Sequence, residues 1–187
     1  MTGSILLGIF IIILVLAAVL VVRTCSRQPT PAMTASVELD KGPRAREYGE
    51  QLSKMIQKET VSSRFDSDKT KYYEFHKILE ELFPLVHKTC EKHVFNGNLL
   101  FKWSGKGKAE PILLMSHQDV VEANGSWEHE PFGGYIDGEG KLWGRGTVDT
   151  KGSLYCIFRS VEELIAEGFQ PEGDVYIASS CTEAVSY

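Results

Sequence analysis

Three clusters of polar residues stand where predicted strands end, and their side chains could together hold a metal ion. The candidates are His117 and Asp119 in S-H-Q-D-V-V, Asp149 in G-R-G-T-V-D-T-K-G, and Glu183 in T-E. In open α/β sheets, ligands bind beyond the carboxyl ends of the strands. We therefore expect these clusters to converge on one point at the edge of a sheet.

These residue types suggest metal-assisted hydrolysis. The imidazole of His117 can bind a metal, and the carboxylate of Asp149 offers two oxygens that could bridge two ions. Asp119 could hold the other ring nitrogen of His117 and so fix its tautomer. Glu183 could take a proton from water held by the metal. Nitrogen and oxygen ligands without thiolate suit zinc, with cobalt or manganese as substitutes.

Each of these residues also has a purely structural interpretation. His117 and Asp119 could form a surface pair, and Asp149 could cap the helix that follows it. Glu183 could be a solvated side chain in a frayed C-terminal tail. The glycines around Asp149 could be turn residues, since G-R-G does not match a phosphate-binding loop. The residues alone leave both interpretations open.

The segments between the clusters predict an α/β fold with a mostly parallel sheet flanked by helices. Strand, hairpin, helix and strand follow one another in that order, which favours parallel elements. The expected elements are a helix from Ala45, a helix at Lys69–His87 ended or kinked by Pro84, strand residues at Val94–Trp103 around an Asn96-Gly97 turn, a strand at Pro111–Ser116 buried on both faces, a hairpin at Tyr135–Gly146, a helix at Gly152–Gly168 and a buried strand at Asp174–Cys181.

An apolar segment, Ile5–Val22, precedes these elements and predicts a transmembrane helix. At about 1.5 Å per residue it spans roughly 27 Å, close to the hydrocarbon thickness of a bilayer. Residues Met1–Ser4 carry no basic side chain, which favours an anchor over a cleaved signal peptide or a buried core helix. Arg23 and Arg27 follow the span and favour a single-pass membrane protein with a cytoplasmic catalytic domain, although two charges leave the opposite topology open.

The chain then divides into an N-terminal tail (1–4), the transmembrane helix (5–22), a linker containing Pro, Ser and Thr (23–44) and one further domain (45–187). The net charge of −5 argues against nucleic acid as a partner, because nucleic-acid binding needs a basic face. The four cysteines form no C-x-x-C pair and are expected to be free thiols, with Cys156 and Cys181 in the core.

Three stretches, S-H-Q-D-V-V, W-E-H-E-P-F-G-G and G-R-G-T-V-D-T-K-G, resemble the M20 metallopeptidase family in their order and spacing. The third stretch is the most specific, and the similarity covers about Glu47–Ser186. Among members of the family, the membrane-anchored ones similar to carboxypeptidase S resemble this chain best.

This resemblance implies an α/β catalytic domain interrupted by a smaller lid or dimerisation domain, with two zinc ions that share a carboxylate and a water. His117 would be a metal ligand, Asp149 the bridging ligand, and Asp119 the residue that orients His117. Glu183 would be the general base that deprotonates the water and later protonates the leaving amine. The substrates would be peptides or N-acyl amino acids, and the family relies on no other cofactor.

One departure from the family pattern affects the metal site. The family has two adjacent acidic residues after the last strand, whereas here Glu183 is followed by Ala184, whose methyl group cannot bind zinc. We therefore expect the chain to be the N-terminal part of a catalytic domain whose C-terminal half and lid are absent, through a partial gene, a frameshift or an early stop. Such a polypeptide should bind zinc weakly and hydrolyse nothing at a useful rate. A homodimer would require the missing domain.

Two other functions compete with this prediction. The chain could be a non-catalytic, membrane-tethered pseudoenzyme or partner-binding module, which one stoichiometric partner would support. It could also be a nucleotide-binding α/β domain, although it has no phosphate-binding loop. The sequence leaves carboxypeptidase, dipeptidase, aminoacylase and deacetylase activities open.

Overall fold

The structure is a computed structural model that describes residues 2–26, 42–65 and 67–185 of the 187-residue chain. The chain forms two units, Met1–Leu39 and Asp40–Tyr187, each of which is described by itself. The linker predicted at 23–44 lies mostly outside the described residues. Its first residues belong to the helix Thr2–Cys25 of the first unit, and its last ones begin the helix Pro43–Gln57 of the second unit.

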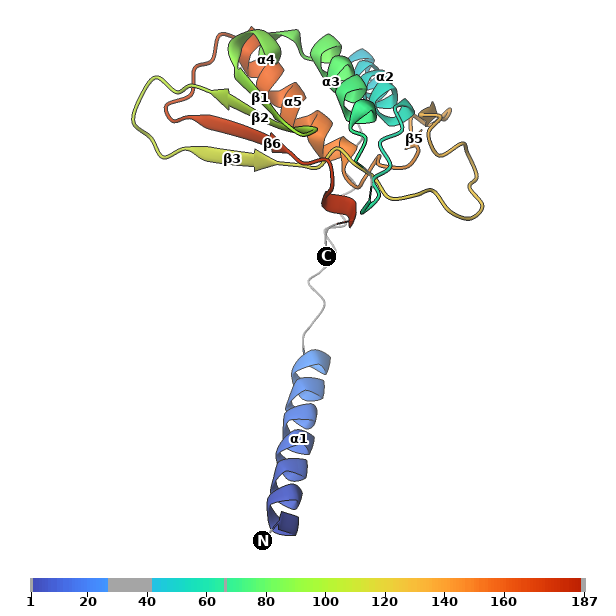
Figure 1. The fold of residues 1–187 in the computed structure, drawn as a ribbon, viewed down its shortest axis with the longest axis vertical. Helices are drawn as coiled ribbons and strands as arrows, with labels where there is room; N and C mark the ends of the chain where they lie inside the picture. Colours follow the sequence, from blue (N-terminus) through green and yellow to red (C-terminus); the bar gives the residue numbers. More distant parts are fainter. Residues whose placement is uncertain (1, 27–41, 66, 186–187) are drawn as a thin grey trace. The chain divides into compact units, whose positions relative to one another are not determined.

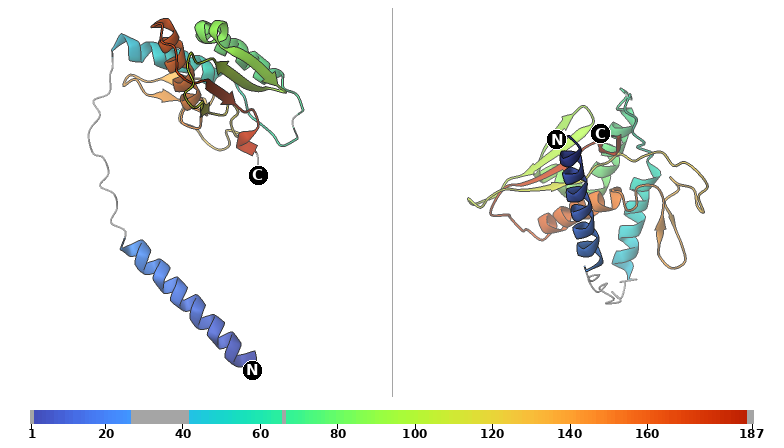
Figure 2. Two further views of the ribbon diagram at one scale, coloured as in Figure 1. Left: turned by 90° about the vertical axis from the view of Figure 1, so that its left-hand side faces the viewer. Right: turned by 90° about the horizontal axis from the view of Figure 1, so that it is seen from below.

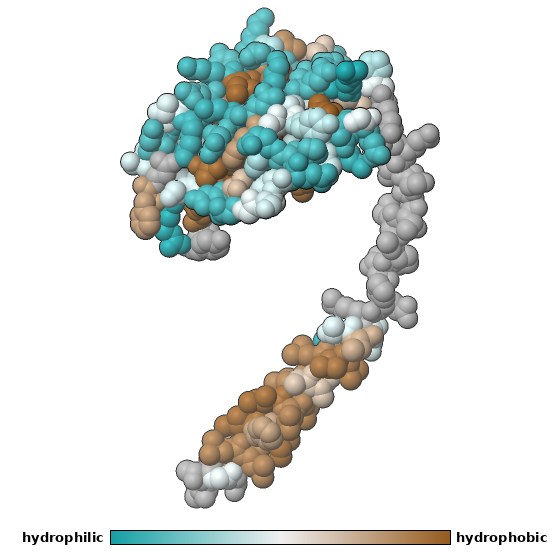
Figure 3. Space-filling model, turned by 90° about the vertical axis from the view of Figure 1, so that its right-hand side faces the viewer, coloured by the Kyte–Doolittle hydropathy of each residue, from teal (hydrophilic) through white to brown (hydrophobic). Residues whose placement is uncertain are grey.

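The first unit contains a single described helix, α1 (Thr2–Cys25). Its segment Ile5–Cys25 is long and apolar enough to cross a membrane, and it includes the predicted span 5–22. Large apolar side chains along it, such as Ile9, Ile12 and Leu20, are exposed, and they cover the visible surface of the helix (Figure 3). A helix that is apolar all round suits burial or a lipid environment better than water.

The second unit has the α/β class predicted from the sequence. Its elements, in chain order, are α2 (Pro43–Gln57), α3 (Thr70–Leu82), α4 (Pro84–Thr89), β1 (Glu91–Phe95), β2 (Asn98–Trp103), β3 (Ile112–Met115), β4 (Tyr135–Ile136), β5 (Leu142–Trp143), α5 (Lys151–Ala166), β6 (Val175–Ser179) and the short 3₁₀ helix η1 (Glu183–Val185). As predicted, Pro84 separates two helices, since its ring cannot continue α3.

The sheet is mixed rather than mostly parallel. Its order is β1-β2-β6-β3, in which β1 and β6 each pair antiparallel with β2, and only β3 and β6 pair parallel. The parallel pair is possible because the connection between its strands is long and carries α5. Sequence order could not reveal that the β1–β2 hairpin lies beside β6, because that pairing depends on contacts far apart in the chain.

A tight turn at Asn96-Gly97 makes the β1–β2 pair antiparallel. Both residues have positive φ, 48° and 87°, as a two-residue hairpin turn requires. A side chain on Gly97 would be strained at this φ and would also meet the sulfur of Cys181 at 3.0 Å. The hairpin therefore depends on the Asn-Gly pair predicted to form it.

The core lies between one face of the sheet and helices α2 to α5 (Figures 1 and 2). Alternate residues of β2 and β6 point into it, and they meet the apolar side of α5. The rings of Phe101 and Phe158 meet edge to face at 5.3 Å, a favourable arrangement of aromatic groups. Burial of this face holds the strands under the helices, and therefore holds the strand ends in place.

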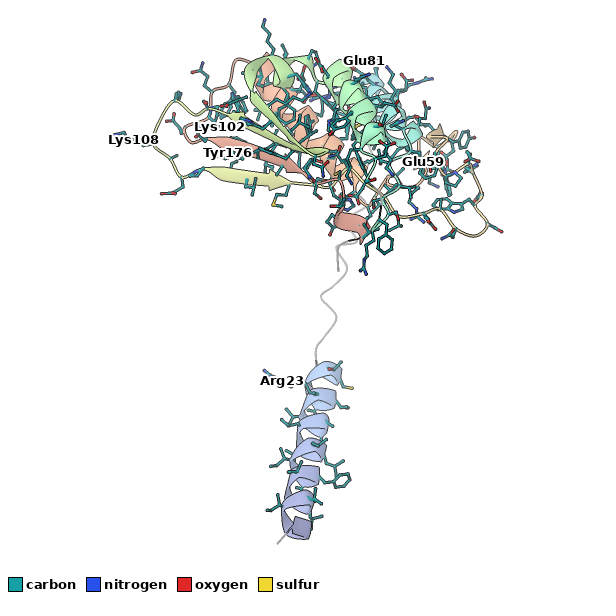
Figure 4. All side chains as sticks on the ribbon, viewed as in Figure 1. Arg23, Glu59, Glu81, Lys102, Lys108 and Tyr176 are labelled. Atoms are coloured by element: carbon teal, nitrogen blue, oxygen red, sulfur yellow. The ribbon has the colours of Figure 1, made fainter. Side chains whose placement is uncertain are left out.

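No described helix of the second unit covers the opposite face of the sheet. On it, Lys102 of β2 and Tyr176 of β6 lie side by side (Figure 4), with the ammonium 5.9 Å from the ring centre. The prediction that the strand at 111–116 is buried on both faces is wrong. Leu113 and Met115 of β3 are 55% and 69% exposed, because β3 is an edge strand that pairs with β6 alone among the described residues.

The cysteines are free thiols, as predicted. Cys181 is buried, which confirms its place in the core. The same prediction for Cys156 is wrong, because Cys156 lies on the side of α5 that faces away from the sheet and is exposed. Apolar neighbours along a helix do not fix which side a given residue takes, and here Tyr155 is buried, Cys156 exposed and Ile157 partly buried.

A buried polar network holds the segment that follows β3. Gln118 is fully buried, and its amide nitrogen donates to the carbonyls of Gly97 (2.8 Å) and Ser179 (3.3 Å). Its amide oxygen faces Nε2 of His76 at 2.9 Å, so this nitrogen of His76 must carry a proton. Burial lowers the pKa of His76 from 6.5 to about 4, which keeps the ring neutral near pH 7.

We expect His76 to make folding stability depend on pH. Its pKa is lowered in the folded state, so the unfolded chain binds the proton more tightly, and stability falls as pH drops from about 7 towards 4. Between pH 7 and pH 5 the loss from this group should be about 2 kcal/mol. Urea unfolding of the full chain in detergent micelles, compared with His76→Gln, measures it. Equal pH dependence in the two proteins would contradict this assignment.

We also expect Glu162→Gln to destabilise the packing of α4 on α5. The buried carboxylate of Glu162 accepts the backbone N–H groups of Leu85 (3.0 Å) and Val86 (2.8 Å) at the start of α4. A neutral amide has one acceptor oxygen instead of two, so the loss should be about 1–2 kcal/mol in the free energy of unfolding. The control is Glu167→Gln at the exposed C-cap position of α5, and it should change stability by less than about 0.5 kcal/mol.

Candidate active site

The parallel β3–β6 pair brings two of the candidate segments to the same edge of the sheet. Its backbone pairing continues past both strands, since Ser116 N–H donates to Ala178 (3.1 Å) and Gln118 N–H donates to Ser180 (2.9 Å). On its other side the segment is held at Val120, whose N–H donates to the carbonyl of Thr60 at 3.1 Å. The residues after β3 are therefore fixed between two neighbouring backbones.

Asp149 approaches the same edge from the start of α5. The hydroxyl of Ser116 lies 3.2 Å from the carbonyl oxygen of Thr150 and can donate to it. Gly152 allows this tight turn, because a side chain there would meet the carbonyl oxygen of Thr147 at 2.2 Å. Asp149 itself is not the N-cap of α5, which is Thr150, and its side chain is 88% exposed.

The buried ammonium of Lys151 fastens α5 to the end of α2. Its Nζ donates to the carbonyls of Met55 (3.0 Å) and Lys58 (2.6 Å). Burial, followed by the nearby charge of Lys58, lowers the pKa of Lys151 from 10.5 to about 7. Carbonyls at a helix C-terminus are a favourable place for a cation, so Lys151 ties the backbone beside Asp149 to a second helix.

His117 lies at the centre of the candidate site. Its Nε2 is 3.1 Å from Oδ1 of Asp149 and 3.2 Å from Oε2 of Glu183. The His117 side chain is 12% exposed, whereas that of Glu183 is 62% exposed. The structure thus brings together His117, Asp149 and Glu183, three residues that lie far apart in the sequence.

Asp119 lies behind His117, away from solvent. The side chain is fully buried, and its Oδ1 is 3.3 Å from Nδ1 of His117. The nearest acceptor for Nδ1 is the backbone carbonyl of Asp119, at 2.8 Å. An Nδ1–H that donates to this oxygen leaves the lone pair of Nε2 directed at the two carboxylates.

These atoms fit part of a zinc site. Zinc ligands of this kind lie about 2.0–2.2 Å from the ion, so two ligands in a tetrahedral arrangement are separated by about 3.4 Å. The separation from Nε2 of His117 to Oδ1 of Asp149, 3.1 Å, is close to that value. Within the described residues, however, no group of three or more His, Cys, Asp or Glu residues could hold an ion by itself.

Little in the local sequence marks the residues that hold this site in place. Gln118 and Ser116 stand next to His117 in the motif, but their contacts are with Ser179, Gly97 and Thr150, which lie elsewhere in the chain. Polarity within an otherwise buried segment is the only feature that could have pointed to Gln118. Its partner His76 was not identified as a site residue at all.

Known proteins resemble this chain in sequence and in structure. The model of "Peptidase family M20/M25/M40" matches residues 113–186. A probable carboxypeptidase S-like 2 of Dictyostelium discoideum is 34% identical over 176 residues, which cover 89% of this chain and 34% of that protein. The N-fatty-acyl-amino acid synthase/hydrolase PM20D1 of Mus musculus is 35% identical over 143 residues, 73% of this chain and 28% of that protein.

The fold is shared with solved structures. Human carnosine dipeptidase 1 superposes with a TM-score of 0.62 at 15% identity, over 76% of this chain and 33% of that one. This chain therefore spans about a third of the length of the proteins that it matches. The family match, the relatives and the shared fold agree that this chain is similar to members of the peptidase family M20/M25/M40.

Proposed function

We propose that the intact protein is a zinc-dependent hydrolase that cleaves amide bonds of peptides or N-acyl amino acids. The observation that carries this proposal is the convergence of Asp149 and Glu183, from two different elements, on Nε2 of His117 at 3.1 and 3.2 Å. The names of the relatives, a carboxypeptidase S-like protein and an N-fatty-acyl-amino acid hydrolase, support the substrate class.

Each residue then has a distinct role. His117 and Asp149 would hold zinc, with cobalt or manganese as substitutes, and Asp149 would be shared between two ions. When bound, the metal supplies Lewis acidity for the scissile carbonyl and for water. Glu183 accepts the proton of the attacking water and returns it to the leaving amine nitrogen. Its side chain is mostly exposed, as a base that must reach water requires.

The described residues supply only part of this site. Ala184 stands where the family that the sequence resembles has a second acidic residue, and its methyl group binds no metal. Catalytic zinc usually has about three protein ligands besides water. In our proposal, the polypeptide alone therefore binds zinc weakly and hydrolyses amides at no useful rate. Homodimer formation would belong to a lid domain outside this sequence.

We expect His117→Ala to reduce zinc binding by about tenfold or more, because it removes the only nitrogen ligand proposed here. Calorimetric titration of zinc into the full chain in detergent micelles measures the change. His93→Ala is the matched control, since His93 also lies beside a carboxylate, 2.9 Å from Glu91, on β1. An equal effect of the two substitutions would show that the binding is nonspecific, and tight binding with steady hydrolysis by the wild type would refute the proposed inactivity.

We expect Ala184→Glu to raise zinc affinity by about tenfold or more, because it supplies a carboxylate where the family has a ligand. The same calorimetric titration compares this variant with the wild type. Ser160→Glu is the control, because it adds the same charge on the exposed surface of α5. If both substitutions change the affinity equally, net charge explains the gain and position 184 is not a ligand position.

We further propose that Ile5–Cys25 anchors the protein in a membrane, with the second unit on the cytoplasmic side. Cys156 is exposed and Cys90 and Cys181 are buried, so a Cys25→Ser variant has one accessible thiol. A membrane-impermeant maleimide should label it in sealed cytoplasm-out vesicles without detergent. Labelling only after detergent is added would indicate the opposite topology, and release of the protein by alkaline carbonate would exclude an anchor.

A further inference from the structure

We propose that Asp119 is a positioning residue for Glu183 as well as for His117, so that one buried carboxylate fixes two of the three groups that converge in the site. This inference rests on the proposed function, in which Glu183 is the base. The contacts that carry it are independent of any metal.

Asp119 receives two hydrogen bonds from the segment that carries Glu183. The backbone N–H of Glu183 donates to Oδ1 at 3.2 Å, and that of Ala184 donates to Oδ2 at 3.0 Å. Both donors lie in η1, the short 3₁₀ helix that follows β6. The first N–H groups of a helix have no partner within it, and a carboxylate is a favourable acceptor for them.

The same carboxylate lies against His117. Its Oδ1, which accepts the N–H of Glu183, is also 3.3 Å from Nδ1 of His117. A single oxygen thus contacts both the imidazole and the backbone of the proposed base. Any displacement of Asp119 would move the ring of His117 and the Glu183 backbone together.

Burial makes these contacts hard to replace. Asp119 has no exposed surface, so water cannot take the place of either donor without opening the site. Upstream of η1, Cys181 N–H donates to Oδ1 of Asn98 at 2.9 Å, which holds the chain two residues past the end of β6. Beyond Cys181, Asp119 accepts hydrogen bonds from two successive backbone N–H groups, those of Glu183 and Ala184, and so helps to set the direction of the Glu183 backbone.

Chemistry explains why this position needs an aspartate. The two backbone N–H donors of Glu183 and Ala184 require an acceptor with two oxygens on a short side chain. An asparagine of the same size has one acceptor oxygen, and its NH₂ group would face one of the donors. Asp119→Asn therefore tests the role with almost no change of volume.

Hydrogen–deuterium exchange of the full chain in detergent micelles measures the effect, with single-residue resolution by mass spectrometry. In Asp119→Asn we expect the amides of Glu183 and Ala184 to exchange about tenfold faster or more, while those of β6 keep their wild-type rates. Asp174→Asn is the matched control, because Asp174 accepts the N–H of Gly105 at 2.9 Å beside the other end of β6. It should speed exchange at Gly105 and leave Glu183 unchanged.

Unchanged exchange at Glu183 and Ala184 in Asp119→Asn would overturn the proposal. If that variant fails to fold, the wild type decides: protection of both amides supports the proposal, and exchange at the rate of an unstructured peptide overturns it. Cobalt(II) absorption on the wild-type sample separates this inference from the proposed function. Protected amides without cobalt binding, even at a large excess of cobalt, would leave the positioning role of Asp119 standing and contradict the proposed partial metal site.

Discussion

The parallel pairing of β3 with β6 is the constraint on which the candidate site depends. Parallel strands place their carboxyl ends at the same edge of a sheet, so His117 and Glu183 must leave it side by side. The pairing also demands a long connection between the strands, and this connection carries Asp149 and α5. One feature of topology therefore accounts for the meeting of three residues that come from three distant parts of the chain.

Buried polar groups then hold the segments that carry these three residues in defined positions. Gln118 and Asp119 lie on either side of the same backbone segment, and each contacts elements that come before or after it in the chain. Lys151 likewise connects α5 to α2, because its ammonium donates to the carbonyl of Met55. Burying such groups is costly unless each is hydrogen-bonded, and these three are. Their partners fix the register of loops that apolar packing alone would leave less defined.

The site combines a rigid interior with an accessible rim. Asp119 is fully buried and His117 nearly so, whereas the carboxylates of Asp149 and Glu183 face solvent. This gradient suits the proposed chemistry, since a ligand must keep its orientation while a base must exchange protons with water. The edge strand β3 carries the exposed apolar residues Leu113 and Met115.

Local signals in the sequence were enough to predict the α/β class, the Asn96-Gly97 turn, the break at Pro84 and the apolar N-terminal helix, and they made His117, Asp119, Asp149 and Glu183 candidates for the site. These features depend on neighbouring residues, whose spacing and backbone preferences the sequence states directly. Only the tertiary structure decided the mixed order of the sheet, the exposure of β3 and Cys156, and the pairing of Gln118 with His76. Those outcomes depend on which distant segments pack against one another. The burial of apolar residues over the whole chain determines this packing, and no local preference does.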